Sequence, residues 1–229
     1  MASRIKVISS MATRQVLADL VELFQRQSAQ AVAVESVGGV DAARRVRAGE
    51  TFDVVVLAAD AIEQLMASGQ IVPGSRVDLV RSGVSIAVRA GAAHPDVGTE
   101  DALKSAVLAA SSLGFSTGPS GVELARLFER WGIADAIRER IVQAPPGVPV
   151  GSLVADGKVE LGFQQLSEVM HLPGIDGVGP LPAPVQIITT FSAGLSATST
   201  QPEAVQAMLD FMISPAAAEA KRRNGMEPA

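Results

Sequence analysis

Four short segments carry the small hydroxyl residues and glycines that bind anions in many proteins. They are Ser9-Ser10, residues 36–39 (SVGG), residues 116–121 (STGPSG) and residues 145–151 (PPGVPVG). If each segment precedes a helix, its backbone N–H groups are unpaired and carry partial positive charge, so an anion can bind without a charged side chain. The segment STGPSG is the most informative, because one helix cap needs one hydroxyl group and this segment has three. The four segments together predict a site for a small anion.

Composition excludes several other kinds of chemistry. The chain has no cysteine, which removes thiol catalysis and disulfides, and its two histidines, His94 and His171, have no metal-ligand spacing. We therefore predict neither a metal nor a cofactor. The net charge of −5 argues against nucleic acid as a partner, and the chain has no tyrosine and one tryptophan, too few aromatics for stacking sites. Ser120 resembles the serine of a nucleophile elbow, but the second glycine comes one position too early.

Charged side chains near these segments are few. Arg44, Arg45 and Arg47 are expected on a solvated helix face. Arg14 would lie in the first turn of the first long helix, where it is a candidate clamp for a carboxylate. His171 is expected to be a surface histidine. The catalytic residue, if there is one, stays unknown at this point.

Strands and helices alternate along the chain and would position the four segments. Apolar runs predict strands at residues 5–9, 31–37 and 52–57, with helices at 12–27, 38–49 and 59–67 between and after them. A second run starts with a strand at residues 84–89. It continues with helices at 100–110, 121–131 and 148–156, strands at 113–116, 141–144 and 160–164, and a short helix from Leu166. A strand at 186–197 and helices at 202–213 and 215–224 end the chain.

This order predicts an α/β protein with mainly parallel sheets flanked by helices. Two runs joined by two crossing strands predict two lobes, residues 1–82 plus 189–229 and residues 83–188, with a ligand cleft between them. No segment has the length of a membrane helix, and the start MASRIKVISS lacks the parts of a signal peptide. We expect a cytoplasmic protein if Met1 is the native start, and a periplasmic one if a leader was removed.

The chain resembles the periplasmic molybdate-binding protein family, which has the type II periplasmic binding fold. The resemblance covers nearly the whole chain. Its specific parts are VISSMATRQVL, FDVVVLAA, TGPSGVELARLFERWGI, ELGFQQLSEV and SPAAAEAKRRNGMEP. It implies a solute-binding protein with a hinge that closes over a small anion, and an ABC permease as partner if the protein is exported. From the net charge and the lack of a long apolar run, we expect no nucleic acid partner and no direct membrane insertion.

The resemblance also implies the ligand positions. Ser10 matches the serine after the first strand, with Ser9 beside it, and Gly38 or Gly39 stands where the family has a second serine. The remaining positions lie in the second lobe: Thr117 and Ser120 at one helix start, Val148 at the next, and Gln165 where molybdate binders have a tyrosine. Two positions thus depart from the molybdate pattern. The departures enlarge the pocket and add an amide, Gln164 or Gln165, that can bind a carboxylate.

A second reading remains open, because an aconitate isomerase is similar to the same broad family. An isomerase of a small unsaturated polycarboxylate needs a general acid or base within reach of an acidic C–H group. Glu35, His171 and Glu168 are the candidates that the sequence offers. The two readings share the anion site and differ in whether a proton moves.

Overall fold

The computed structural model describes residues 4–229, in which strands and helices alternate. The chain forms two compact units. Unit 1 comprises the chain up to Ser82 together with Thr190–Ala229, and unit 2 comprises Gly83–Thr189. The limits expected from the sequence differ in placing Thr189 in the first part.

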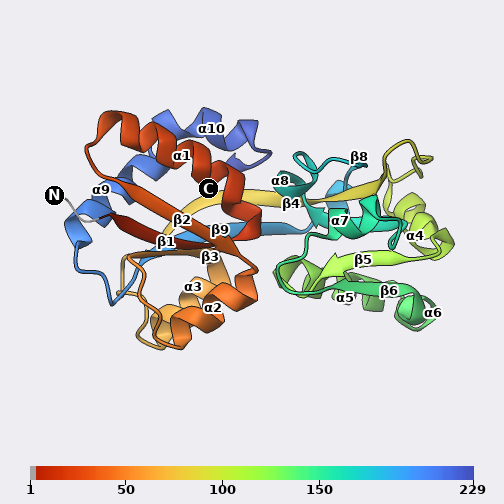
Figure 1. Ribbon diagram of the computed structural model, residues 1–229. Helices are drawn as coiled ribbons and strands as arrows, with labels where there is room; N and C mark the ends of the chain where they lie inside the picture. The colour runs from red at the N-terminus through yellow and green to blue at the C-terminus, as the bar shows by residue number, and fades with distance from the viewer. Residues whose placement is uncertain (1–3) are drawn as a thin grey trace. The chain divides into compact units, whose positions relative to one another are not determined.

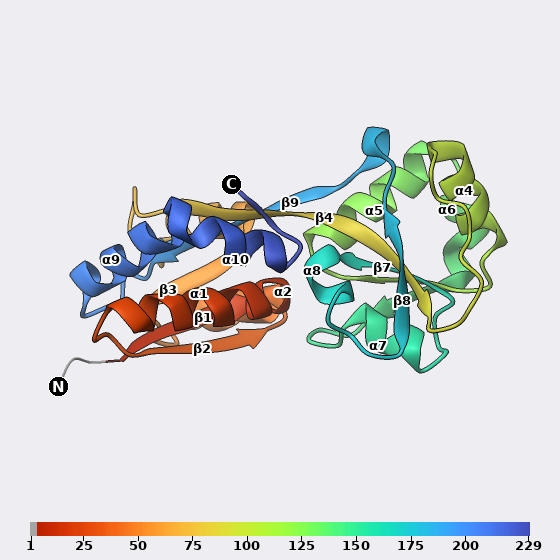
Figure 2. The ribbon, with the colours of Figure 1, turned by 90° about the horizontal axis from the view of Figure 1, so that it is seen from above.

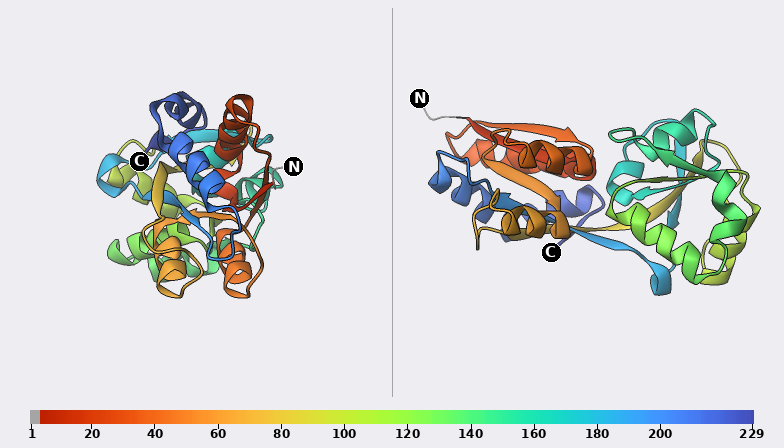
Figure 3. Two further views of the ribbon diagram at one scale, coloured as in Figure 1. Left: turned by 90° about the vertical axis from the view of Figure 1, so that its left-hand side faces the viewer. Right: turned by 90° about the horizontal axis from the view of Figure 1, so that it is seen from below.

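Unit 1 is a sheet covered by helices on both faces. Its strand order is β2-β1-β3-β9-β4, with β10 paired to β4. Figure 1 shows α1, α9 and α10 on one face and α2 and α3 on the other, and Figure 2 shows α1 beside α10. The right panel of Figure 3 presents the face with α2 and α3. The elements are β1 (Ile5–Ser10), β2 (Val32–Val37), β3 (Val54–Ala58), β4 (Val77–Arg89), β9 (Ile188–Leu195), β10 (Glu227–Pro228), α1 (Arg14–Gln27), α2 (Gly39–Arg47), α3 (Ala59–Ala67), α9 (Pro202–Ile213) and α10 (Ala218–Arg223).

The central strand of unit 1 shows why its sequence folds this way. Every residue of β3, VVVLA, is buried, as expected for a strand with helices on both faces. One face packs against α1 and α9 through Val54 and Val56, and the other packs against α2 and α3 through Val55 and Leu57. Helix α1 buries Val16, Leu20 and related positions on one side only, which is the pattern of an amphipathic helix on a sheet.

Unit 2 has the strand order β4-β7-β5-β6, with β8 also paired to β4. One face of its core is centred on Phe128, whose ring lies about 6.0 Å from the rings of Trp131 and Phe163. The other face is covered by α7, which approaches closely because Gly162 has no side chain: a Cβ there would lie 2.5 Å from a methyl carbon of Val154. The elements are β5 (Leu113–Ser116), β6 (Ile141–Ala144), β7 (Leu161–Gln165), β8 (Ile175–Pro180), α4 (Glu100–Ala109), α5 (Pro119–Arg130), α6 (Ala134–Ile137), α7 (Val150–Ala155) and α8 (Leu166–Val169).

The sheets are less parallel than expected. Strands β1, β2 and β3 are parallel, as are β5, β6 and β7, but β9 is antiparallel to β3, and β4 is antiparallel to β7, β8 and β10. The reason is that β4 and β9 each have residues in both units, so they are not part of strand–helix–strand repeats. Strand β4 also begins at Val77 and not at Val84. Strands β8 and β10 were not predicted.

Candidate functional site

The carboxyl ends of β1 and β2 bring the predicted residues of unit 1 together. The two strands are parallel, with Ser10 opposite Val37, so their ends lie at one edge of the sheet. Helix α2 begins at Gly39, and a Cβ on Gly39 would lie 3.5 Å from the Ser10 Cβ. Gly38 precedes the helix as its cap residue, and its carbonyl oxygen accepts a hydrogen bond from the Ala42 N–H. Ser10 and the start of α2 therefore form one cluster.

The two neighbouring serines of β1 have different roles. The Ser9 side chain is fully buried, and its hydroxyl lies 2.8 Å from the hydroxyl of Ser36 on β2. Ser10 does not cap the short 3-10 turn Met11–Thr13 that follows it, and its Oγ lies 3.5 Å from the Thr13 Oγ1, too far for a strong bond. Ser9 thus stabilises the strand pair, and Ser10 is the hydroxyl that remains for a ligand.

In unit 2 the segment STGPSG begins α5 at the end of β5. Gly118 is the cap residue, with no side-chain hydrogen bond, and its N–H donates to the Ser116 Oγ at 3.3 Å. Thr117 is exposed and Ser120 is half-buried, and neither hydroxyl has a protein partner among residues 4–229. Gly121 has a packing role, because a Cβ there would lie 1.8 Å from the Ser116 carbonyl oxygen. Two hydroxyls and the first turn of a 12-residue helix remain for a ligand.

The structure corrects the role expected of Val148. Helix α7 begins at Val150, two residues later than predicted, and the Val148 N–H closes a turn onto the Pro145 carbonyl at 3.0 Å. Gly147 makes this turn possible with a φ of 79°, which glycine adopts without strain. The amide of Val148 is therefore not a helix-start amide. At the start of α7, the N–H of Gly151 instead donates to the Gln164 Oε1 at 2.8 Å.

Gln165 ends β7 with a buried and only partly satisfied amide. Its side chain is 4% exposed, and its Nε2 donates to the Thr189 Oγ1 at 2.9 Å. Its Oε1 is buried and has no hydrogen-bond partner. A buried polar atom without a partner costs about 1–3 kcal/mol, so its presence calls for an explanation such as a ligand. Because β5 and β7 are parallel neighbours, their ends lie at the same edge of this sheet as STGPSG.

Glu168 lies one helical turn beyond Gln165, on α8. Burial raises the pKa of its carboxyl group to about 7, and a hydrogen bond with the Gln164 side chain offsets part of this effect. A carboxylic acid with a pKa near 7 can both take and give a proton at neutral pH. Gln164 is itself 6% exposed and is held by the Gly151 N–H.

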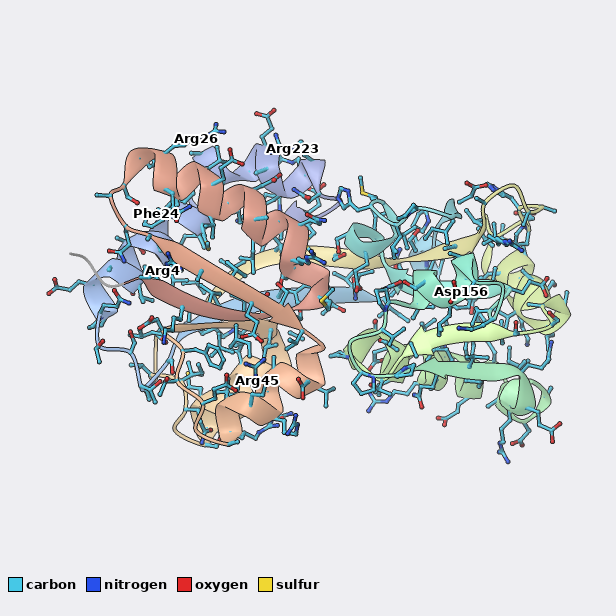
Figure 4. All side chains as sticks on the ribbon, in the orientation of Figure 1. Arg4, Phe24, Arg26, Arg45, Asp156 and Arg223 are labelled. Carbon is cyan, nitrogen blue, oxygen red and sulfur yellow. The ribbon has the colours of Figure 1, made fainter. Side chains whose placement is uncertain are left out.

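The other charged candidates are on the surface. Glu35 is paired with Arg45, which also binds Glu50, and Figure 4 shows Arg45 on α2. His171 is exposed beyond the end of α8. Arg14 is exposed at the first residue of α1. Glu35 is therefore part of an ion-pair network, whereas Arg14 has no ion pair in the described chain and stays a candidate clamp.

Among residues 4–229, no group of three or more histidine, aspartate or glutamate side chains is placed to hold a metal ion. The same part of the chain contains no helix that is long and apolar enough to cross a membrane. A hollow of about 450 Å³ lies between α8 and β8, but it is lined mainly by apolar residues and does not include Glu168 or Gln165.

Sequence reasoning missed two contributors to the β7 edge. Thr189 lies on β9, 24 residues from Gln165, so no local pattern connects the two side chains. Gly151 binds Gln164 through its main chain, which the sequence does not reveal. The useful signal was the pair of glutamines in LGFQQ, because two consecutive amides at the end of an apolar strand are unusual.

Comparisons with known proteins show the family and the fold of the chain. Residues 5–227 match the family described as bacterial extracellular solute-binding proteins. An aconitate isomerase from a Pseudomonas species is 40% identical over 185 residues, which are 80% of this chain and 70% of that protein.

Two solved structures with the same fold bind tetrahedral oxyanions, according to their names. The periplasmic molybdate-binding protein of Azotobacter vinelandii has a TM-score of 0.81 and 23% identity, covering 99% of this chain and 100% of that one. A sulfate-binding protein of Mycobacterium tuberculosis has a TM-score of 0.79 and 16% identity, covering 99% and 87%. These likenesses confirm the type II periplasmic binding fold expected from the sequence. With a match over residues 5–227 and a relative 40% identical over most of its length, the chain belongs to the bacterial extracellular solute-binding protein family.

Proposed function

We propose that this protein binds a small polycarboxylate, of the size of aconitate or citrate. The observation that carries the proposal is the buried side-chain amide of Gln165. Its Nε2 donates a hydrogen bond to Thr189, and its Oε1 has no hydrogen-bond partner. A ligand atom at the end of β7 would satisfy that position. The remaining groups at the strand ends, Ser10, Thr117 and Ser120, are neutral donors that suit an anion.

The chemistry of the Gln165–Thr189 pair supports an anionic ligand. The Thr189 hydroxyl can donate or accept, so the amide can bind it through either Nε2 or Oε1. When Oε1 accepts from Thr189, the Nε2 group becomes the free atom and offers N–H donors to an anion. A planar amide donor fits a planar carboxylate oxygen well, and each hydrogen bond to a charged group contributes about 1.5–3 kcal/mol.

The same position argues against a dedicated molybdate receptor. The chain has no tyrosine to supply the phenol expected there, and Gly38-Gly39 stands where a second serine is expected. Losing two charge-assisted hydrogen bonds at about 1.5–3 kcal/mol each predicts molybdate binding weaker by roughly two to four decades. The space left by the missing side chains suits a longer ligand.

A second candidate function is isomerisation of the bound polycarboxylate. Two observations favour it: the relative that is 40% identical over 80% of this chain is an aconitate isomerase, and Glu168 titrates near neutral pH beside Gln164. A third role, delivery of the ligand to an ABC permease, would follow from the family name if the protein is exported.

Calorimetry with molybdate, tungstate, citrate and both aconitate isomers tests the proposal. We expect micromolar or tighter binding of at least one polycarboxylate and much weaker binding of molybdate. Sub-micromolar molybdate binding with no polycarboxylate binding would refute the proposal and favour an oxyanion receptor. Proton NMR of each aconitate isomer with the protein then separates isomerisation from binding alone.

A further inference from the structure

The two glutamines at the end of β7 differ in whether their side-chain amides can turn over. The Gln164 Oε1 accepts a hydrogen bond from the Gly151 N–H at 2.8 Å. A main-chain N–H can only donate, so this bond holds the Gln164 amide in one orientation. Gln165 is bonded through its Nε2 to the Thr189 hydroxyl, which both donates and accepts, so the same hydroxyl can also bond to Oε1. Gln165 therefore has two orientations that keep its partner, whereas Gln164 has one.

The main chain around Gln165 and Thr189 is held in place by a third amide. Val84 on β4 lies opposite Gln165 in the antiparallel pair of β4 and β7. The Gln186 Oε1 accepts from the N–H groups of Val84 and Ile187 at 3.0 and 2.8 Å, and its Nε2 donates to the Val84 carbonyl oxygen at 3.2 Å. Gln186 comes three residues before Thr189, so one side chain fixes the strands that carry both partners. A change in the Gln165–Thr189 pair is therefore a change of side chains.

The orientation in the structure leaves an acceptor free, whereas a polycarboxylate needs donors. The Gln165 Oε1 is buried and has no hydrogen-bond partner. A carboxylate oxygen only accepts, so it is repelled by Oε1 and bound by the Nε2 group. The side chains of Gln165 and Thr189 are both buried, so water compensates little for a wrong pairing. A carboxylate can bind at this position only when the amide turns over.

We propose that Thr189 is a positioning residue that allows a bound carboxylate to turn the Gln165 amide over. This inference rests on the proposed function and adds a change of state at that site. Without ligand, Nε2 donates to the Thr189 hydroxyl. In the complex, that hydroxyl donates to Oε1, and Nε2 donates to the carboxylate. Hydroxyl, amide and carboxylate then form a chain of hydrogen bonds in which each bond strengthens the next.

Proton–nitrogen NMR of the full-length protein tests this change, because it distinguishes Nε2 from Oε1. The Gln165 Nε2 signal is identified by its loss in Gln165→Leu. Without ligand, its protons lie beside Thr189, and we expect nuclear Overhauser effects between them and the Thr189 methyl group. With saturating trans-aconitate these effects should be lost, and the Nε2 protons should shift downfield as they bind the carboxylate. The Gln164 amide, held by Gly151, should keep its contacts in both states.

Substitutions at position 189 test the positioning residue itself. Thr189→Ser keeps a hydroxyl and should bind trans-aconitate within about threefold of the unsubstituted protein, with the same NMR change. Thr189→Val has nearly the same shape but leaves Oε1 without a donor in the complex, so calorimetry should show binding weaker by about three- to tenfold. Thr190→Val, the same change at the next position of β9, lies on the opposite face of the strand and should leave the affinity unchanged. A role of Thr189 in folding alone would lower the urea midpoint of Thr189→Val without changing its affinity.

The other results overturn the inference and the proposed function separately. If trans-aconitate binds while the nuclear Overhauser effects between Gln165 and Thr189 remain, the amide does not turn over, and the binding function stands without this inference. The inference also fails if these effects are absent before ligand is added, or if Thr189→Val binds as tightly as the unsubstituted protein. If no polycarboxylate binds, the proposed function fails as well.

Discussion

Glu168 should make unit 2 less stable as the pH rises through neutrality. Burial raises the pKa of its carboxyl group from about 4.5 in the unfolded chain to about 7 in the folded one. Between these values the folded state holds a proton that the unfolded state has lost, so raising the pH favours unfolding. Over about 2.5 pH units, at about 1.4 kcal/mol per unit, the full loss is about 3.5 kcal/mol. The Glu168→Gln variant cannot ionise and should not show this loss.

Urea unfolding followed by tryptophan fluorescence measures this effect in unit 2, because the chain's one tryptophan, Trp131, ends α5 in that unit. The difference in free energy of unfolding, variant minus unsubstituted protein, should rise by about 2.5 kcal/mol between pH 5 and pH 8, because the unfolded carboxyl group is already mostly ionised at pH 5.

A matched control separates this effect from a general loss of charge. The pKa of Glu160 is lowered because the Ser111 hydroxyl and N–H donate to its carboxylate. The stability that this carboxylate contributes is present above pH 4.5 and lost as the pH falls through its folded pKa, so Glu160→Gln should give a constant difference from pH 5 to pH 8. A difference for Glu168→Gln that is equally flat would refute the reasoning about its burial.

Three other changes test the site and its support. Gly121→Ala should destabilise unit 2 by about 3 kcal/mol or more, because its Cβ would meet the main-chain oxygen at the end of β5; an unchanged urea midpoint would contradict this packing. Gln165→Tyr should strengthen molybdate binding by about one to two decades in calorimetry and weaken polycarboxylate binding, and no change in either would remove this residue from the site. Ser10→Ala should weaken polycarboxylate binding about tenfold or more, whereas Ser75→Ala, a change elsewhere in unit 1, should affect only stability. The expectation that residues of both units bind one ligand stays a prediction, and equal affinities for Ser10→Ala and the unsubstituted protein would contradict it.

Four of the elements could be predicted from the sequence to the residue. The helices at Ala59–Ala67 and Pro202–Ile213 and the strands at Leu113–Ser116 and Ile141–Ala144 have the predicted limits. Strand β8, Ile175–Pro180, could not be found this way, because IDGVGP has no alternation and its pairing with β4 includes a register shift.

The site was harder to predict because its decisive contacts are not local. The sequence indicated that hydroxyls and glycines gather at strand ends, and Ser10 and Gly39 do lie together. It also suggested Val148 as a helix-start amide, but a turn uses that N–H. Whether a given polar group is used by the fold or left for a ligand depends on its partners. Ser9 and Ser10 are adjacent in the sequence and differ in this respect.

The position of β9 constrains the order in which the molecule can be made. In unit 1, β9 lies between β3 and β4, although it is synthesised more than a hundred residues after β4 begins. A chain emerging from the ribosome can therefore complete unit 2, which is continuous in sequence, while the sheet of unit 1 still lacks an interior strand. Until Thr190–Ala229 has emerged, the nascent chain exposes the edges of β3 and β4 that later pair with β9. It also exposes the apolar surface that α9 later covers. During that interval unit 1 is open to chaperones, export factors or aggregation, while unit 2 can already hold its final fold.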